Sequence, residues 1–280
     1  TLQPIDNLSI KPFFNYSDFE GDYDGGAFQD ADNRFSVSMR NQGVTAEFRS
    51  DRFRIRSTYQ YVDTERLFVS QFGETPFEGN FQDFDTYLNA EIADGLKALA
   101  GINWQEQKVP ANDDAGLGEQ NASFTSPYAT MIYRLQSGLG LEAGIRLNSH
   151  SEYGTNTTYS FSPSFDVNEN FKLFATIGSG FKAPTLEQLF GQFGANPDLD
   201  PESSRNIELG VQGYLAGESL MVEAVYFNRQ IDNLIAFEPD FPPTPHTLTD
   251  HVIMRQYPAI FQDLMSRERG YNHASRNSDR

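Results

Sequence analysis

Four acidic side chains near the start of the chain are the best candidates for metal chemistry. Glu20, Asp22, Asp24 and Asp30 lie on a single Gly-containing stretch. Carboxylate oxygens are ligands that calcium prefers, and a loop lets several of them converge on one ion. The spacing is not that of an EF-hand, because Ala31 stands where the motif that starts at Glu20 needs its final Glu. A calcium site formed by these four carboxylates is one prediction, and the favoured interpretation is an ordinary solvated acidic loop without a cofactor.

Aromatic side chains farther along the chain are candidates for ligand binding. Phe190 and Phe193, together with Asn196, lie in a segment rich in Gly, Asn, Asp and Pro, and we expect these three to contact a small-molecule ligand. Rings on a loop can stack on a large ligand, whereas packing in an aromatic girdle at a membrane boundary is the alternative. The same two interpretations apply to other aromatic residues of loop-like segments: Phe19, Tyr23, Phe28, Phe72 and Phe77.

The histidines give no catalytic arrangement. His150 stands between two serines with no carboxylate at a readable spacing, so we expect it to form hydrogen bonds within a loop. His246 and His251 are too loosely spaced for a zinc signature. The sequence therefore predicts that the protein is not an enzyme.

Composition excludes two classes of protein. The net charge of -18 argues against nucleic-acid binding, which needs a basic surface. No apolar run approaches the roughly 18 residues that a membrane-spanning helix needs. The 22 Gly, 13 Tyr and 24 Phe, against one Trp and no Cys, indicate instead a turn-rich and aromatic-rich β protein.

Apolar and polar residues alternate along most of the chain. A period of two places the two sets on opposite faces of a sheet, and we expect about eleven antiparallel strands between Leu8 and Ile235. Apolar parity changes near Gly43, which predicts a β-bulge there. One face should carry Phe53, Ile55, Tyr59, Leu139, Leu141 and Ile145, and the opposite, lumen-facing side should carry Arg52, Arg54, Arg56, Glu142 and Arg146.

The links between these strands alternate in length. Short turns alternate with long polar links at 18–33, 63–79, 109–121 and 181–203. Short turns on one side and long loops on the other are typical of an up-and-down transmembrane β-barrel of the outer-membrane kind. The predicted fold class is therefore all-β, an antiparallel up-and-down transmembrane β-barrel segment.

The most specific motif runs from residue 171 to residue 211. It reads FKLFATIGSGFKAPTLEQLF, then NPDLDPESS, then IELGV, and VYFNRQIDNLI follows in the same order. This series resembles the middle of the barrel in TonB-dependent outer-membrane receptors, in particular the branch that resembles cobalamin receptors. The segment FKAPTLEQLF is interpreted as structural, with Thr185 capping a short helical turn whose apolar residues are Leu186, Leu189 and Phe190.

The resemblance implies a fold and a function. Members of the family have a 22-strand barrel filled by an N-terminal plug, so this chain is expected to hold about half of the barrel and no plug. It also implies location in the bacterial outer membrane, contact with outer-membrane lipid, and energy supplied by TonB through the plug. The expected ligand is a scarce nutrient, with a cobalamin-type corrinoid first and an iron siderophore or haem second. Cobalamin receptors order their outer loops with calcium in a location comparable to that of Glu20, Asp22, Asp24 and Asp30.

Two other functions stay open at this point. A passive porin-like channel would have the same strand pattern, and a soluble β-sandwich binding module would have the same period of two. The chain is divided into a partial barrel at 1–237 and an atypical tail at 238–280. The tail loses the alternation at its FPPTP run, so we expect it not to pair into the sheet and to be mobile or loosely helical.

Overall fold

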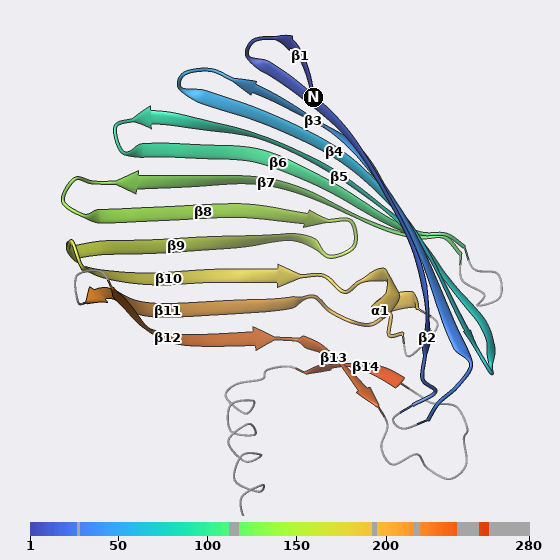
Figure 1. The fold of residues 1–280 in the computed structure, drawn as a ribbon. Helices are drawn as coiled ribbons and strands as arrows, with labels where there is room; N and C mark the ends of the chain where they lie inside the picture. The colour runs from blue at the N-terminus through green and yellow to red at the C-terminus, as the bar shows by residue number, and fades with distance from the viewer. Residues whose placement is uncertain (27–28, 112–117, 192–194, 216–218, 240–251, 258–280) are drawn as a thin grey trace, which may run out of the picture. The chain divides into compact units, whose positions relative to one another are not determined.

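Long antiparallel strands form where the sequence alternates between apolar and polar residues. The computed structural model describes residues 1–26, 29–111, 118–191, 195–215, 219–239 and 252–257. In these residues twelve strands form one sheet, and their order in the sheet is their order in the sequence (Figure 1). This arrangement confirms the predicted antiparallel up-and-down fold class. No helix within the described residues is both long and apolar enough to cross a membrane.

Two compact units divide the chain. The first covers residues 1–133 and 144–157, and the second covers residues 134–143 and 158–280. The first unit holds β1 (Leu2–Ile5), β2 (Leu8–Tyr23), β3 (Asn33–Arg49), β4 (Phe53–Ser70), β5 (Gly73–Ala93), β6 (Leu96–Val109), nearly all of β7 (Gln120–Arg134) and the end of β8 (Leu139–His150). The second holds most of β9 (Gly154–Asn168), then β10 (Phe171–Lys182), α1 (Leu186–Phe190), β11 (Glu202–Leu215), β12 (Leu220–Asp232), β13 (Leu234–Pro239) and β14 (Val252–Tyr257).

The predicted number of strands is confirmed. Strands β2 to β12 are the eleven that begin at Leu8 and end at Asp232, and β1 adds a short strand before them. In the first unit, Ile55 lies opposite Leu88 and both are exposed apolar residues. Arg54 points to the other side, where its guanidinium carbon lies 5.9 Å from the ring centroid of Tyr87. We call these two sides of the first unit the apolar face and the polar face.

The predicted bulge at Gly43 is wrong. Strand β3 pairs with both neighbours without a break in register, and Gly43 is opposite Phe13 on one side and Gln60 on the other. Apolar parity changes because Phe35 and Val37 point to the polar face. On that face Val37 is buried and Phe35 packs against other rings. The change of parity therefore reflects a local apolar cluster on the polar face, and the backbone of β3 stays regular.

The link predicted at 63–79 is mostly strand. β4 continues to Ser70 and β5 starts at Gly73, so only a two-residue turn separates them. Gly73 has a φ of 116°, a conformation that suits glycine at such a turn. The link at 18–33 is likewise shortened, because β2 runs to Tyr23. The polar residues of these two segments do not end the strands. Aromatic side chains pair across the strand ends instead, as Phe68 does with Tyr23 and Phe77.

Glycines opposite aromatic residues recur along the strands. A Cβ on Gly101 would lie 2.7 Å from the Tyr128 ring, and a Cβ on Gly21 would lie 2.9 Å from the Phe35 ring. The missing side chain therefore gives each ring the space to lie across the neighbouring strand. The register pairs of this kind are Phe13–Gly43, Gly21–Phe35, Gly101–Tyr128, Phe174–Gly210 and Phe171–Gly213.

The described part of the tail forms a separate sheet. β14 pairs antiparallel with β13 and not with the twelve-stranded sheet. The expectation of a loose helix is wrong for Val252–Tyr257, where β-branched residues at its start pair as a strand with β13. The other residues of the tail lie outside the described ranges, and the domain boundary at residue 237 stays a prediction.

Candidate functional site

Five aromatic side chains gather on the polar face at the loop ends of β2 to β5. Ring centroids are 6.2 Å apart for Phe19 and Phe35, and 6.3 Å apart for Phe35 and Phe68. Phe68 also lies 5.7 Å from Phe77 and 6.0 Å from Tyr23, with both pairs edge to face. We call these five residues the loop-end aromatic cluster, and Phe68 lies at its centre.

Strand register explains why residues so distant in sequence meet. Phe35 is opposite Gly21 on one side and Phe68 on the other, so three strands place their side chains in one row. Gly21 leaves room for the ring of Phe35. Phe19 is 52% exposed, while the other four rings are half-buried, so the cluster keeps an accessible aromatic surface.

A cation lies beside these rings. Arg66 is opposite Phe77, and its guanidinium carbon is 5.6 Å from the Phe77 ring centroid. The side chain is exposed, so its other donors face solvent. Aromatic faces and a guanidinium together can bind a large ligand that has both a flat apolar surface and an anionic group.

A hydrogen-bonded network of polar side chains continues along the same face. Asp83 Oδ1 accepts hydrogen bonds from Asn103 Nδ2 at 2.8 Å and from Gln105 Nε2 at 2.9 Å. Asn103 Oδ1 in turn accepts one from Arg146 Nη2 at 2.9 Å. The guanidinium carbon of Arg146 also lies 5.5 Å from the Tyr128 ring centroid. We call these five residues the polar-face network.

Alternation places the network and the aromatic cluster on one surface. Phe77, Asp83 and Asp85 have the same parity in β5, and Asp85 accepts a hydrogen bond from the Tyr128 hydroxyl at 2.9 Å. Asn103 is only 4% exposed, and its amide groups have hydrogen-bond partners. A fixed, satisfied polar lining of this kind suits a water-filled or protein-filled interior and not a lipid-facing surface.

Two of the predicted ligand residues of the second unit, Phe190 and Asn196, are built into a folded loop. Phe190 packs against the buried cluster of Leu189, Leu199 and Ile235. The backbone N–H of Asn196 donates to the Gln188 carbonyl at 2.8 Å, and its Oδ1 accepts from the Asp198 N–H at 3.0 Å. Phe193 lies outside the described residues. Contact of Phe190, Phe193 and Asn196 with a ligand stays a prediction.

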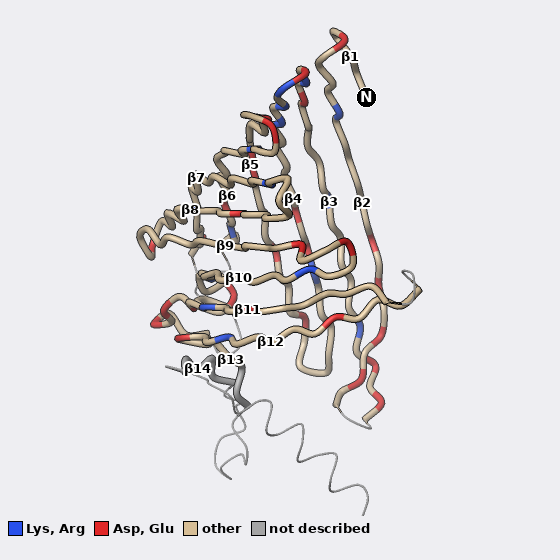
Figure 2. Tube along the Cα trace, turned by 90° about the vertical axis from the view of Figure 1, so that its left-hand side faces the viewer, with Lys and Arg blue, Asp and Glu red and all other residues tan. Residues whose placement is uncertain are grey.

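The predicted calcium ligands are not assembled into a site. Glu20 and Asp22 lie on β2, Asp24 follows it, and Asp30 precedes β3. Asp22 Oδ1 lies 3.8 Å from the Arg34 Nε, and no group of three or more Asp, Glu, His or Cys in the described ranges could hold a metal ion. Figure 2 shows the acidic residues at this end of β2. Calcium binding stays a prediction, which calorimetry on the full protein with Asp22→Asn and Asp24→Asn would test.

His150 is a hydrogen-bonding residue of a turn, as the sequence predicts. Its Nδ1 accepts hydrogen bonds from the backbone N–H groups of Glu152 at 3.0 Å and Tyr153 at 3.3 Å. The ring packs edge to face on Phe124, with centroids 4.4 Å apart. His246 and His251 lie outside the described residues.

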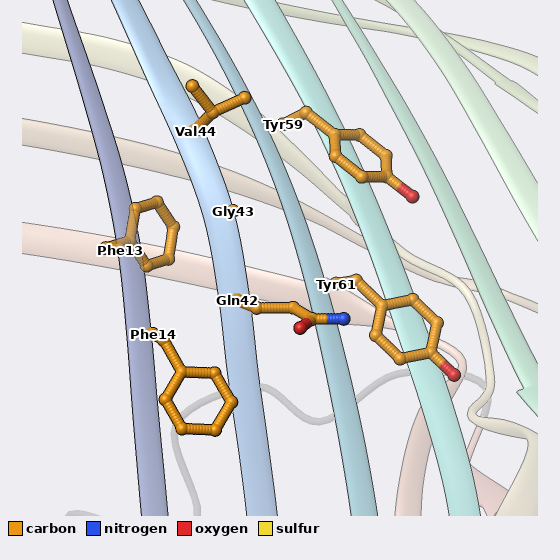
Figure 3. Close-up of a pocket in the computed structure, with 7 residues that line it drawn as sticks. All are labelled: Phe13, Phe14, Gln42, Gly43, Val44, Tyr59 and Tyr61. Atoms are coloured by element: carbon orange, nitrogen blue, oxygen red, sulfur yellow. The ribbon is translucent and has the colours of Figure 1, made fainter.

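A shallow hollow in the first unit brings none of the predicted site residues together. It lies across β2, β3 and β4 around Gly43, and Figure 3 shows the rings of Tyr59 and Tyr61 beside each other on β4. Phe14, Val44 and Tyr59 of its lining are exposed apolar-face residues. Its position favours an uneven membrane-facing surface over a ligand site.

Comparison with protein families matches residues 3–259 to "TonB dependent receptor-like, beta-barrel". Among curated proteins, the chain is 29% identical over 241 residues to the vitamin B12 transporter BtuB of Photobacterium profundum, covering 85% of this chain and 38% of that protein. A vitamin B12 transporter BtuB of Vibrio vulnificus is 29% identical over 163 residues, which cover 56% of this chain and 25% of that protein.

Among solved structures, the siderophore receptor PirA of Pseudomonas aeruginosa is similar with a TM-score of 0.76, at 20% identity over 92% of this chain and 49% of that one. A mutant of the ferric enterobactin receptor PfeA of Pseudomonas aeruginosa, in complex with enterobactin, gives a TM-score of 0.71 at 20% identity, over 91% of this chain and 46% of that one. At this identity the likeness shows the fold alone.

These comparisons agree with the geometry of the strands. The chain spans less than half the length of the relatives it matches. The family match covers most of the described strands, so the soluble β-sandwich alternative is wrong, because a sandwich needs two packed sheets. The chain belongs to the TonB-dependent receptor β-barrel family and is an outer-membrane protein.

Proposed function

We propose that the full protein containing this segment imports a scarce nutrient across the outer membrane with energy from TonB, and that its ligand is a cobalamin-type corrinoid. The observation that carries the proposal is the match of 241 residues to a vitamin B12 transporter. An iron siderophore is the second candidate, because PirA is a siderophore receptor and PfeA is a ferric enterobactin receptor. As such an importer, the protein would bind its ligand and move it across the membrane, and it would not be an enzyme.

The polar face offers surfaces that suit such ligands. A corrinoid has a broad ring plane, amide groups at its edge and one phosphodiester. The loop-end aromatic cluster would contact the ring plane, and Arg66 beside Phe77 would pair with the phosphodiester. A catecholate siderophore also combines aromatic rings with negative charge, so this chemistry supports both ligand classes and uptake experiments must separate them.

Two further partners follow from the same proposal. Exposed apolar residues on the strands support contact with outer-membrane lipid, for example Ile55, Leu88, Ile145, Leu209 and Tyr226. Coupling to TonB would take place through the plug of the full protein. A passive porin-like channel is the alternative, and it would carry solutes without TonB.

Uptake assays on the full protein test the proposal. The protein is produced in the outer membrane of a Gram-negative host that lacks its own corrinoid and siderophore receptors, with and without TonB. We expect uptake of labelled cyanocobalamin that requires TonB, and binding without uptake when TonB is absent. Uptake of ferric siderophores alone would replace the corrinoid with the second candidate. Uptake that continues without TonB would show a passive channel.

A further inference from the structure

A small hydrophobic core lies under the loop between β10 and β11. Leu189, Leu199 and Ile235 are buried together, and Phe190 packs against them. Leu199 is only 2% exposed. Ile235 belongs to β13, which follows β12, so this core joins the loop to a corner of the chain that comes much later in the sequence.

Local hydrogen bonds hold the first part of this loop. The Thr185 hydroxyl accepts from the Gln188 N–H at 3.2 Å, and the Gln188 side chain accepts from the Thr185 N–H at 2.9 Å, which is a complete capping box. After α1, the Gly191 N–H donates to the Glu187 carbonyl. A side chain at Gly191 would collide with that carbonyl oxygen. Local hydrogen bonds within the chain therefore hold this described part of the loop.

One carboxylate connects this loop core to the corner between β12 and β13. Glu202 Oε1 accepts hydrogen bonds from Lys182 Nζ at 3.0 Å and from the backbone N–H of Ile235 at 2.9 Å. Lys182 and Glu202 are opposite each other in the register of β10 and β11. The corner turns at Asn233, whose φ is 58°. Glu202 is well placed for this role, because its side chain is only 12% exposed.

We propose that Glu202 is a positioning residue that keeps the described parts of the loop after β10, residues 183–191 and 195–201, preformed for ligand. By accepting from Ile235 N–H, it holds the corner on the mouth of the β10–β11 hairpin, so that Ile235 covers Leu189 and Leu199. Without this acceptor the Ile235 N–H is left buried and unpaired, and the loop core opens. A preformed loop pays no ordering entropy when ligand arrives. Only this last consequence depends on the proposed function.

Hydrogen exchange on the full protein tests the positioning role. Glu202→Met removes the acceptor, Glu202→Asp keeps the charge but shortens the side chain, and Glu202→Gln keeps an acceptor of the same length. Glu208→Gln, at an exposed residue of the same strand β11, is the matched control. We expect amide protection in 186–191 and 233–236 to fall about tenfold in the Met and Asp variants, and to stay near wild type in the Gln and control variants.

A binding measurement with cyanocobalamin accompanies the exchange measurement. We expect affinity to fall about tenfold in Glu202→Asp and to be restored in Glu202→Gln. Unchanged exchange in both loss variants overturns the proposal, as does lowered protection with unchanged affinity, because Glu202 would then be structural only. If the wild-type protein binds no cyanocobalamin, the proposed ligand is wrong, and exchange alone still decides whether Glu202 keeps the loop folded.

Discussion

Single residues of the first unit fall into two groups: some have surface that a ligand can reach, and others are buried with hydrogen-bond partners inside the protein. Phe68 contacts three other rings, and Phe19 and Arg66 keep surface exposed to solvent. Asn103, in contrast, is buried with both of its amide atoms hydrogen-bonded. A ligand can gain contacts from the first group without breaking existing bonds, so mutations in the loop-end aromatic cluster should change binding more than mutations on the apolar face.

Phe68→Ala should weaken binding of the ligand by about tenfold, because aromatic contacts contribute roughly 0.5–1.5 kcal/mol each beyond area burial and Phe68 supports its neighbours. Equilibrium binding of cyanocobalamin to whole cells that display the full protein measures this. Phe84→Ala, on the apolar face, is the matched control and should bind like wild type. Equal losses in the two variants would contradict a role for the cluster.

His150→Leu should loosen the turn that follows β8, because two backbone N–H groups lose their acceptor and each satisfied bond contributes about 1 kcal/mol. Hydrogen exchange at Glu152 and Tyr153 should rise about tenfold. His150→Asn supplies a shorter acceptor and should recover part of the protection. The idea fails if Leu and Asn variants exchange alike.

The strands as elements depend on glycine and aromatic pairs as much as on alternation. Where a ring crosses a neighbouring strand, the partner must lack a side chain, and the register shows this at Gly21, Gly43 and Gly101. Such pairs fix which residues stand opposite each other, since a slip by one residue would drive the ring into a Cβ. They are therefore register markers within the sheet.

Gly101→Val should destabilise the barrel by about 2–3 kcal/mol, because its Cβ would lie 2.6 Å from the Thr86 carbonyl oxygen and 2.7 Å from the Tyr128 ring. Denaturant unfolding of the full protein in detergent measures this loss. Gly79→Val is the control, since its nearest neighbour, the Lys108 carbonyl oxygen, is 3.4 Å from the Cβ. A similar loss at Gly79 would mean that packing around Gly101 is not the cause.

At the scale of the whole molecule, the family assigns the apolar face to lipid and the polar face to the barrel interior. Exposed apolar residues such as Ile55 and Leu88 would be unfavourable in water, but they suit a membrane. The polar-face network would be unfavourable in lipid, where unsatisfied polar groups cost several kcal/mol each. Adjacent residues of one strand should therefore lie in opposite environments, and labels placed on two such residues test this assignment directly.

Ile55→Cys and Arg54→Cys should report these two environments. This chain has no Cys, so each variant introduces a single label within it. We expect a fluorophore at residue 55 to be quenched by a lipid-borne quencher, and a cysteine at residue 54 to react with a water-soluble maleimide. Reversed results at the two positions would place the faces the other way round.

The sequence alone determined the fold class, the faces of the strands and the cap of α1. These features are local, because a period of two assigns neighbours to opposite faces, and Thr185 and Gln188 are three residues apart. The motif from residue 171 to residue 211 added the family, since its order of residues is specific even without coordinates.

Only the tertiary structure decided which distant residues meet. Phe35, Phe68 and Phe77 form one cluster because β3, β4 and β5 share a register, and that register is set by pairing across the sheet. The same pairing turned the expected long link at 63–79 into strand and kept Gly43 in a regular ladder. Glu202 reaches the Ile235 N–H through a corner that no sequence period marks. Contacts between strands join residues that are distant in the sequence. Alternation therefore predicts on which face of the sheet a side chain lies, but not which side chain of the neighbouring strand it contacts.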